Sequence, residues 1–368
     1  MKEKLLRFVK AEPVLVVSGL LALASMAMVP PSAAYFSYVD FRTLGILFCL
    51  MAAVAGLTEA GLFGAAAAVL VKRGGSRKRL CLLLVLLCFA ASMLITNDVA
   101  LITFVPLTLL LLNGAEEQCR IFTVVMETIA ANLGSMLTPV GNPQNLYLFS
   151  HYELSPGEFF AVTAPVWGMG LILTTGAVLF AKLPGNVSPN MEEVEPFNGK
   201  KALLYGGMFL LSLLAVFRIL HWVVVLAAAV VLLLIFNRKL FRKIDYSLLL
   251  TFLFFFLLVG NLGRIPAVQR TISGMLAGRE VLVSAAVSQV ISNVPAALML
   301  SGFSEEWRGL LVGTNIGGLG TLIASMASLI SFRLYSRGEN AHTGRYLAMF
   351  FVYNVLFLIL LFGIFFRM

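Results

Sequence analysis

Between Leu80 and Leu112 the chain reads LCLLLVLLCFAASMLITNDVALITFVPLTLLLL, an apolar run of 33 residues that is interrupted at Thr96-Asn97-Asp98. A second apolar stretch, from Glu280 to Phe303, is interrupted at Ser292-Asn293-Val294-Pro295. Both patterns predict a re-entrant hairpin, in which two short helices meet at a polar tip inside the membrane. Such a tip needs protein or a water-filled cavity around it, because an unpaired backbone group in lipid costs several kcal/mol. The alternative, two short spans joined by an external loop, requires a longer and more polar turn.

The composition of the whole chain is that of a membrane protein. Of its 368 residues, 60% are apolar and 12% are charged, against roughly 45–50% and about 25% in soluble globular proteins. Apolar runs of about 17–25 residues or more can each cross a hydrocarbon core of roughly 30 Å. Such spans are predicted near residues 13–29, 41–57, 118–149, 158–181, 201–217, 221–237, 246–262, 305–332 and 345–366. The sequence therefore predicts an all-α polytopic membrane protein and excludes a cytosolic enzyme.

The N-terminal segment has two interpretations. Its basic residues, apolar run and Pro30-Pro31-Ser32-Ala33-Ala34 resemble a cleaved secretory signal. The run from Pro13 to Val29 is, however, longer than the usual signal core of about 7–15 residues, and more spans follow directly. We therefore interpret this run as the first transmembrane helix.

The distribution of basic residues predicts the orientation. Nine crossings from a cytoplasmic N-terminus place 20 of the 27 Lys and Arg in inside loops, as the positive-inside rule requires. The net charge of +9 thus reflects topology, and we expect no nucleic-acid partner. The expected location is the cell (inner or plasma) membrane, with the C-terminus outside. The first hairpin then opens from the cytoplasm and the second from outside.

A linker divides the chain into two parts. Residues 182–200 contain three prolines and the acidic run Glu192-Glu193-Val194-Glu195, and we expect this linker to be cytoplasmic. Before it lies a first repeat, residues 1–181, with hairpin 80–112 and broken span 118–149. After it, residues 201–368 comprise an extra span and a second repeat, with hairpin 280–303 and broken span 305–332.

Two short sequence matches relate the two halves. Ile95-Thr96-Asn97 corresponds to Ile291-Ser292-Asn293, and Asn132-Leu133-Gly134 with Thr138 corresponds to Asn315-Ile316-Gly317 with Thr321. Each half also has a short arm before its hairpin, near 61–72 or 265–278. Because of the extra span, the second half enters the membrane from the opposite side. Inverted-topology repeats with paired broken elements near the midplane are typical of secondary transporters.

The broken spans carry the candidate binding groups. Between Ala131 and Asn145 the chain has two glycines, two prolines and three Asn, which one regular helix cannot hold because Pro lacks an N–H and Gly costs about 1 kcal/mol. Unwinding frees carbonyls for a cation, and half-helix N-termini offer N–H groups to an anion. A simple kink, or close helix packing for the glycines, is the alternative. The candidate substrate-binding residues are Thr96, Asn97, Asn132, Gly134, Thr138, Gly141, Asn142, Asn145, Ser292, Asn293, Asn315, Gly317 and Thr321.

Two ionisable residues are predicted inside the membrane, where burial of a charge is expensive and points to function. Asp98 is the candidate proton acceptor or cation ligand, with a cap on the returning helix as its structural alternative. Glu127 is the candidate proton relay, with pairing to a neighbouring helix as its alternative. A coupling Na⁺ can be held at Asn97, Asp98 and Gly141.

The cysteines indicate neither a disulfide nor a metal site. Cys49, Cys81, Cys88 and Cys119 form no CxxC pair and fall in or beside apolar segments, where cysteine acts as a small hydrophobe. We expect no metal and no cofactor other than H⁺ or Na⁺ as a coupling ion.

These motifs resemble those of the ion transporter superfamily, which includes citrate and dicarboxylate permeases, arsenite permeases and related sodium/proton antiporters. Thr96-Asn97 and Ser292-Asn293 resemble the paired Ser-Asn-Thr signatures of the dicarboxylate branch. Asp98, at the third position of the first signature, is similar to the arsenite and sodium/proton branch, and Val294 also departs from the signature. The greatest similarity is to bacterial citrate-transporter-like permeases. The resemblance implies an elevator-like movement of a hairpin-bearing domain, often in a homodimer.

The sequence therefore predicts a secondary active transporter in the lipid bilayer, which moves a small anion or oxyanion (carboxylate-like or arsenite-like) coupled to H⁺ or Na⁺. The alternative is a Na⁺/H⁺ antiporter that uses Asp98. A membrane-embedded enzyme or receptor is disfavoured, because the sequence has no nucleophile-base pair, no metal cluster and no sizeable extramembrane domain.

Overall fold

The computed structural model describes residues 12–65, 75–187, 197–338 and 341–367. The basic residues before Glu12, most of the predicted arm near 61–72 and the centre of the linker lie outside these ranges. One antiparallel pair of two-residue strands, β1 (Gly75–Ser76) and β2 (Asn186–Val187), is present. The remaining regular structure of the described residues is helical, so the prediction of an all-α polytopic membrane protein is confirmed.

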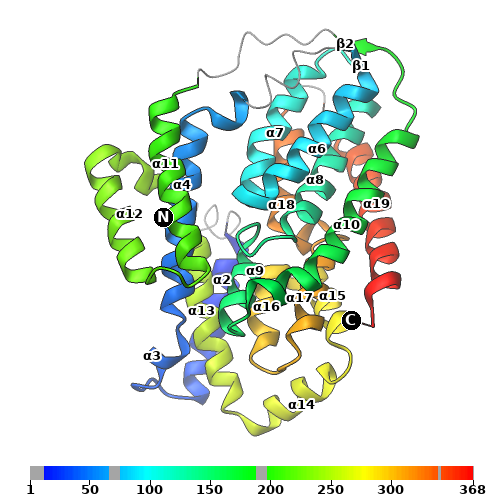
Figure 1. Ribbon diagram of the computed structural model, residues 1–368. Coiled ribbons are helices and arrows are strands. Elements are labelled where there is room, and N and C mark those ends of the chain that lie inside the picture. Colours follow the sequence, from blue (N-terminus) through cyan, green and yellow to red (C-terminus); the bar gives the residue numbers. More distant parts are fainter. Residues whose placement is uncertain (1–11, 66–74, 188–196, 339–340, 368) are drawn as a thin grey trace, which may run out of the picture.

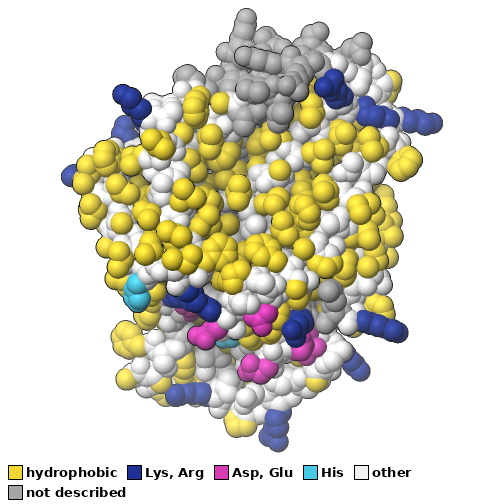
Figure 2. All heavy atoms as spheres, viewed as in Figure 1, with side chains coloured by type: hydrophobic (Ala, Val, Ile, Leu, Met, Phe, Trp, Pro, Cys, Tyr) yellow, Lys and Arg dark blue, Asp and Glu magenta, His cyan; other side chains and the backbone are white. Residues whose placement is uncertain are grey.

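Helices of membrane-spanning length account for much of the chain. Within the described ranges, six are long and apolar enough to cross a membrane. These are α4 (Phe41–Glu59), α6 (Arg77–Ile95), α10 (Pro156–Phe180), α11 (Gly199–Val216), α13 (Tyr246–Gly263) and α19 (Thr343–Phe365). Three shorter apolar helices are α2 (Pro13–Met28), α7 (Asn97–Leu111) and α12 (Trp222–Phe236). Figure 2 shows a wide hydrophobic belt, with Lys and Arg side chains beyond both of its edges.

The two predicted hairpins are helix pairs that break at a single residue. The first joins α6 to α7 through Thr96, and the second joins α15 (Glu280–Ile291) to α16 (Asn293–Ser301) through Ser292. Figure 1 shows α6 and α7 in the upper half of the molecule and α15 and α16 in the lower half. The predicted second arm is α14 (Pro266–Leu276), which meets α15 at a bend of 111°.

Both predicted broken spans are divided into separate helices. Predicted span 118–149 consists of α8 (Glu117–Ser135) and α9 (Pro143–His151), joined by a turn that contains Pro139 and Gly141. Predicted span 305–332 consists of α17 (Trp307–Ile316), the 3₁₀ turn η2 (Leu322–Ala324) and α18 (Met326–Ser336). The helices end where Gly and Pro accumulate, as expected from their low helix propensity.

A second group of helices lies beside the hairpins, whereas α10 and α19 pack against α8. Helix α4 packs against α11 and α12, which Figure 1 shows on the opposite side of the molecule from α6, α8 and α10. Close approach is possible because Gly45 faces Trp222, where a Cβ would lie 2.8 Å from the indole ring. Helices α2 and α13 also pair, and Asn261 Nδ2 donates to Ser25 Oγ at 2.9 Å. A short helix, α3 (Tyr35–Tyr38), and a 3₁₀ turn, η1 (Arg238–Lys243), complete this group.

Candidate functional site

Both hairpin tips have the same unusual backbone. Thr96 has φ 68° and ψ 150°, and Ser292 has φ 78° and ψ 154°. A positive φ is uncommon for residues other than Gly, Asn and Asp, and such strain persists only where the surroundings fix it. The next residue continues the pattern, since the Oδ1 atoms of Asn97 and Asn293 each accept a hydrogen bond from the following backbone N–H, at 3.0 and 2.9 Å. The two tips are therefore equivalent structures.

A threonine from the adjoining broken span holds each hairpin. The Thr138 hydroxyl donates to the carbonyl of Met93, and the Thr321 hydroxyl donates to the carbonyl of Gln289 at 2.9 Å. Met93 and Gln289 each lie three residues before their tip. The predicted correspondence of Thr138 with Thr321 therefore describes equivalent contacts, and both residues brace a hairpin.

Gly134 and Gly317 allow the broken spans to touch the hairpins. A Cβ on Gly134 would clash with the Phe89 carbonyl and lie 2.5 Å from Ser92 Oγ. A Cβ on Gly317 would lie 2.8 Å from Ala285 Cα and 2.9 Å from Ser288 Cβ. These glycines therefore permit close helix packing, and neither residue lines either of the two cavities at the hairpin tips.

Asparagine side chains join the two halves at their centre. Asn142 Nδ2 donates to Asn315 Oδ1 at 3.2 Å, and Ser325 Oγ donates to Asn132 Oδ1 at 3.0 Å. Each bond links the break of one half to the helix before the break of the other. All four side chains are buried. Loss of either bond would therefore leave buried polar groups without a hydrogen-bond partner, which is unfavourable. This pair of reciprocal bonds fixes how the two halves meet.

Amide side chains also satisfy the carbonyls that unwinding releases. Asn145 Nδ2 lies 3.4 Å from the Ser135 carbonyl, 3.1 Å from that of Met136 and 3.3 Å from that of Thr138. In the second half, Gln289 Nε2 donates to the carbonyls of Gly317 and Leu319 at 2.8 and 2.9 Å. Much of the unwound backbone is therefore capped by protein.

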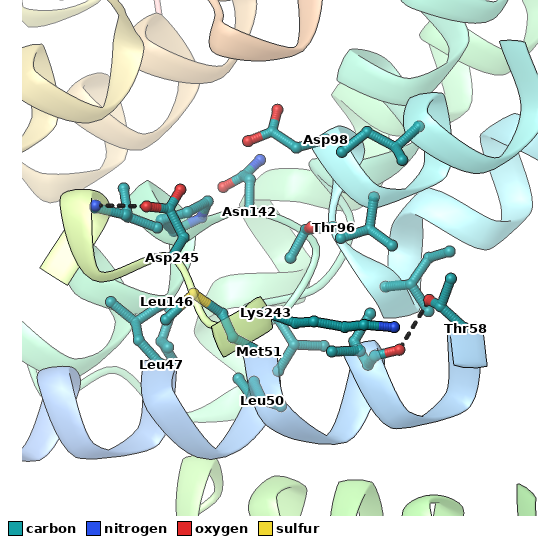
Figure 3. Close-up of a pocket in the computed structure, with 18 of the residues that line it drawn as sticks. Leu47, Leu50, Met51, Thr58, Thr96, Asp98, Asn142, Leu146, Lys243 and Asp245 are labelled. Carbon is teal, nitrogen blue, oxygen red and sulfur yellow. Dashed lines mark hydrogen bonds between the residues drawn. The ribbon is translucent and has the colours of Figure 1, made fainter. Parts of the chain in front are cut away.

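The tips face two adjoining cavities. A cavity of about 330 Å³ is lined by Thr96, Asp98 and Asn142 on one side and by α4 and Lys243 on the other. A second, of about 90 Å³, is lined by residues of both tips, Asn97 and Asp98 with Ser292 and Asn293. Asp98 and Asp245 line both cavities. Figure 3 shows the Asp98 and Asp245 side chains reaching into the larger cavity from different elements, near Asn142.

Three carboxyl groups gather at the smaller cavity. Besides Asp98 and Asp245, Glu12 at the start of α2 lines it. Burial and the nearby charge of Asp245 raise the pKa of Glu12. One Asp98 oxygen, Oδ1, has no hydrogen-bond partner among the described residues, and the same holds for Oε1 of buried Gln144, which also lines this cavity. Unpaired carboxylate and amide oxygens suit a proton or a cation.

Lys243 places a positive charge at the wall of the larger cavity. Its Nζ lies 3.3 Å from Glu59 Oε2, and Lys201 Nζ lies 3.0 Å from Glu59 Oε1. Asn237 Nδ2 also donates to Glu59, at 2.9 Å. The lysine is thus paired on the α4 side while its stem lines the cavity.

Glu127 lies apart from both cavities. Its carboxyl group is fully buried among α6, α7 and α8, and Oε1 accepts a hydrogen bond from Thr108 Oγ1 at 2.5 Å. Oε2 has no partner within the described ranges. Among the described residues, no hydrogen bond joins Glu127 to Asp98, and Glu127 lines neither cavity that Asp98 lines. The relay role therefore stays a prediction.

The candidate residues thus fall into two layers. Those that line a cavity are Thr96, Asn97, Asp98, Asn142, Ser292 and Asn293. Those that lie behind them and hold the tips in place are Asn132, Gly134, Thr138, Gly141, Asn145, Asn315, Gly317 and Thr321. Gly141 does so through its carbonyl, which accepts from the Asn97 N–H at 3.1 Å.

Sequence reasoning did not select five residues that the structure places at or beside the site. They are Glu12, Gln144, Lys243, Asp245 and Gln289. Gln144 lies inside the predicted broken span 118–149, and Gln289 lies inside the predicted hairpin 280–303. A polar amide side chain within these apolar segments is the sequence feature that could have identified both residues. The other three flank ordinary spans.

Two polar helix breaks that meet beside a shared cavity within a multi-pass helical protein are typical of a membrane transport protein. The chain belongs to a family described as citrate transporter, whose model matches residues 5–304. This confirms the resemblance to the citrate-transporter branch of the ion transporter superfamily. The family is described as a transporter, and so are MJ0456 and LSI3 among the relatives, so the expectation that the chain is not an enzyme is also confirmed.

Relatives match along most of the chain. An uncharacterised transporter, MJ0456, of Methanocaldococcus jannaschii is 34% identical over 330 residues, which are 89% of each chain. The inner membrane protein YbiR of Escherichia coli is 32% identical over 302 residues, 80% of each chain. The silicon efflux transporter LSI3 of Oryza sativa is 31% identical over 138 residues, 37% of this chain and 28% of that protein.

Proposed function

We propose that the protein moves a small anion or oxyanion across the cell membrane, coupled to H⁺ or Na⁺. The observation that carries this proposal is the arrangement of the two hairpin tips, whose Asn, Ser and Thr groups face cavities shared with Asp98. Amides and hydroxyls can donate to the oxygens of a carboxylate or an oxyanion. A cavity of about 330 Å³ is at the lower end for ligand sites, so the cargo is small.

The coupling ion binds at Asp98 in this proposal. An anion beside the carboxyl groups of Asp98, Asp245 and Glu12 is disfavoured until a proton or cation reduces their charge. Loading of Asp98 would therefore precede or accompany binding of the cargo. A Na⁺ ion at Asn97, Asp98 and Gly141 is one form of this proposal, and protonation of Asp98 is the other.

The movement is proposed to be of the elevator type. The larger cavity lies between the first hairpin and the group formed by α4, η1 and α13. Displacement of the hairpins against this group would move the cavity toward the other side of the membrane. A cytoplasmic N-terminus, an outside C-terminus and a homodimer belong to the same proposal.

One relative bears on the type of cargo. Its description as a silicon efflux transporter supports testing oxyanions and oxyacids beside carboxylates, because dissolved silicon is an oxyacid.

A second candidate function is Na⁺/H⁺ antiport without an organic cargo. The gathering of Asp98, Asp245 and Glu12 around the smaller cavity favours it, because carboxylates bind protons and Na⁺ in competition.

Transport by purified protein in proteoliposomes separates the two functions. We expect one solute from a panel of di- and tricarboxylates, arsenite, silicate and phosphate to accumulate under an imposed H⁺ or Na⁺ gradient, and none in protein-free liposomes. A pH-sensitive dye inside the same vesicles reports Na⁺-driven H⁺ movement. Such movement in the absence of every solute would establish the antiporter instead. Absence of both signals would contradict both functions.

A further inference from the structure

A polar cavity lies away from the transport site, at the N-terminal ends of α6 and α8. It has a volume of about 290 Å³ and is lined by Arg77, Glu116 and Lys182, together with other residues that directly follow α10. Figure 1 shows these ends beside the β1–β2 pair, at the upper edge of the molecule. Charged side chains in this position mark the boundary between the hydrocarbon core and water.

The Arg77 guanidinium group lines this cavity and has free hydrogen-bonding capacity among the described residues. Its side chain is only 15% exposed, and its Nε has no hydrogen-bond partner among the residues that the structure describes. Its Nη1 lies 3.8 Å from Glu116 Oε1, but the Glu116 side chain is 70% exposed, so this pairing is weak. A phosphate group can accept hydrogen bonds from the guanidinium group in the fixed geometry that Arg prefers.

An apolar groove continues from the polar cavity. It has a volume of about 460 Å³ and is lined by Ile121 of α8 and by Ala348, Val352 and Arg345 of α19. The polar cavity and the groove share Gln118, Met349 and Tyr353. From Arg345 to Tyr353 the groove follows α19 for about 12 Å at 1.5 Å per residue.

We propose that this composite site binds one anionic phospholipid. Its phosphate lies against Arg77 and Lys182, and the first part of an acyl chain occupies the groove between α8 and α19. Charge complementarity selects an anionic lipid, since each basic side chain near the membrane surface strengthens such binding about fivefold. The apolar continuation selects a lipid over a free anion. This inference is independent of the transported solute.

Lipid retention measured by native mass spectrometry tests the proposal. Protein in detergent is incubated with dioleoylphosphatidylglycerol or dioleoylphosphatidylcholine, and parallel samples receive inorganic phosphate or glycerol phosphate as competitor. We expect preferential retention of one phosphatidylglycerol, without displacement by either soluble phosphate. The double variant Arg77→Ala/Lys182→Ala should lower this retention by roughly 25-fold.

Two further variants keep the test decisive. Val352→Trp fills the groove at a side chain that is 64% exposed, so it should lower retention without unfolding the protein. Arg270→Ala/Arg279→Ala removes the same charge from exposed positions in another part of the chain and should leave retention unchanged. Equal retention of both lipids, unchanged retention in the Val352→Trp variant, or displacement by inorganic phosphate would overturn the proposal.

Discussion

Replacement of Asp98 by Asn is expected to lower ion-driven transport by roughly 100-fold, with the protein still folded. The substitution keeps the size of the side chain but removes the proton acceptor and the charge that a cation requires. Interactions of charged groups of about 1.5–3 kcal/mol correspond to losses of up to roughly 150-fold. Initial rates in proteoliposomes under the gradient that drives the wild-type protein give the measurement.

Asp40→Asn provides the matched control for this result. Asp40 caps α4 and its carboxylate accepts from the Thr43 N–H at 2.9 Å, and it lines neither cavity of the site. Since Asn is an equally good N-cap residue, transport should remain near the wild-type rate. Full ion-driven transport by the Asp98→Asn protein would show that the coupling ion binds elsewhere.

Replacement of Gly134 by Ala is expected to destabilise the protein by about 1–3 kcal/mol, the usual range for an overpacked core. The added methyl group would clash with the Phe89 carbonyl, which belongs to the helix that carries the first tip. A backbone carbonyl cannot change rotamer to avoid the clash, as a side chain can. Helices α6 and α8 must therefore move apart to accommodate the added methyl group. The melting temperature in detergent should fall by several degrees, with loss of transport.

Gly176→Ala is the opposite case on a neighbouring helix. A Cβ at Gly176 in α10 would meet nothing within 4 Å, and Ala is favoured over Gly in a helix by about 1 kcal/mol. The melting temperature should therefore stay constant or rise. A Gly134→Ala protein as stable as the Gly176→Ala protein would contradict the close contact of α6 with α8.

The hairpins and breaks could be predicted because their signals are local. Thr96-Asn97-Asp98 interrupts a long apolar run, and the Gly and Pro residues after Asn132 disrupt a helix wherever they lie in the fold. The similarity of Asn132-Leu133-Gly134 to Asn315-Ile316-Gly317 also predicted which residues have equivalent contacts. Local signals of this kind do not require knowledge of which helices are neighbours.

The carboxyl groups that face Asp98 could not be predicted in this way. Asp245 accepts from the Leu248 N–H at 2.9 Å and so has the sequence context of an ordinary helix cap. Glu12 precedes an apolar run, like many interfacial residues. The fold brings these groups to the cavity that Asp98 lines, because α13 packs against α2 and against α16 of the second hairpin. That packing depends on contacts between distant segments of the chain. For the same reason, the sequence could not distinguish Asn142, which lines the larger cavity, from Asn315, which lines neither cavity and accepts a hydrogen bond from Asn142.

The central claim is that the two hairpin tips share one water-accessible site inside the membrane. Thr96→Cys and Asn293→Cys, made one at a time, test it by reaction with a membrane-impermeant thiol reagent in proteoliposomes. The wild-type protein is the control, because its four cysteines are buried. The account predicts that both new cysteines react and that the transported solute or coupling ion protects both. Failure of either to react, or protection of one cysteine without the other, would contradict a shared site.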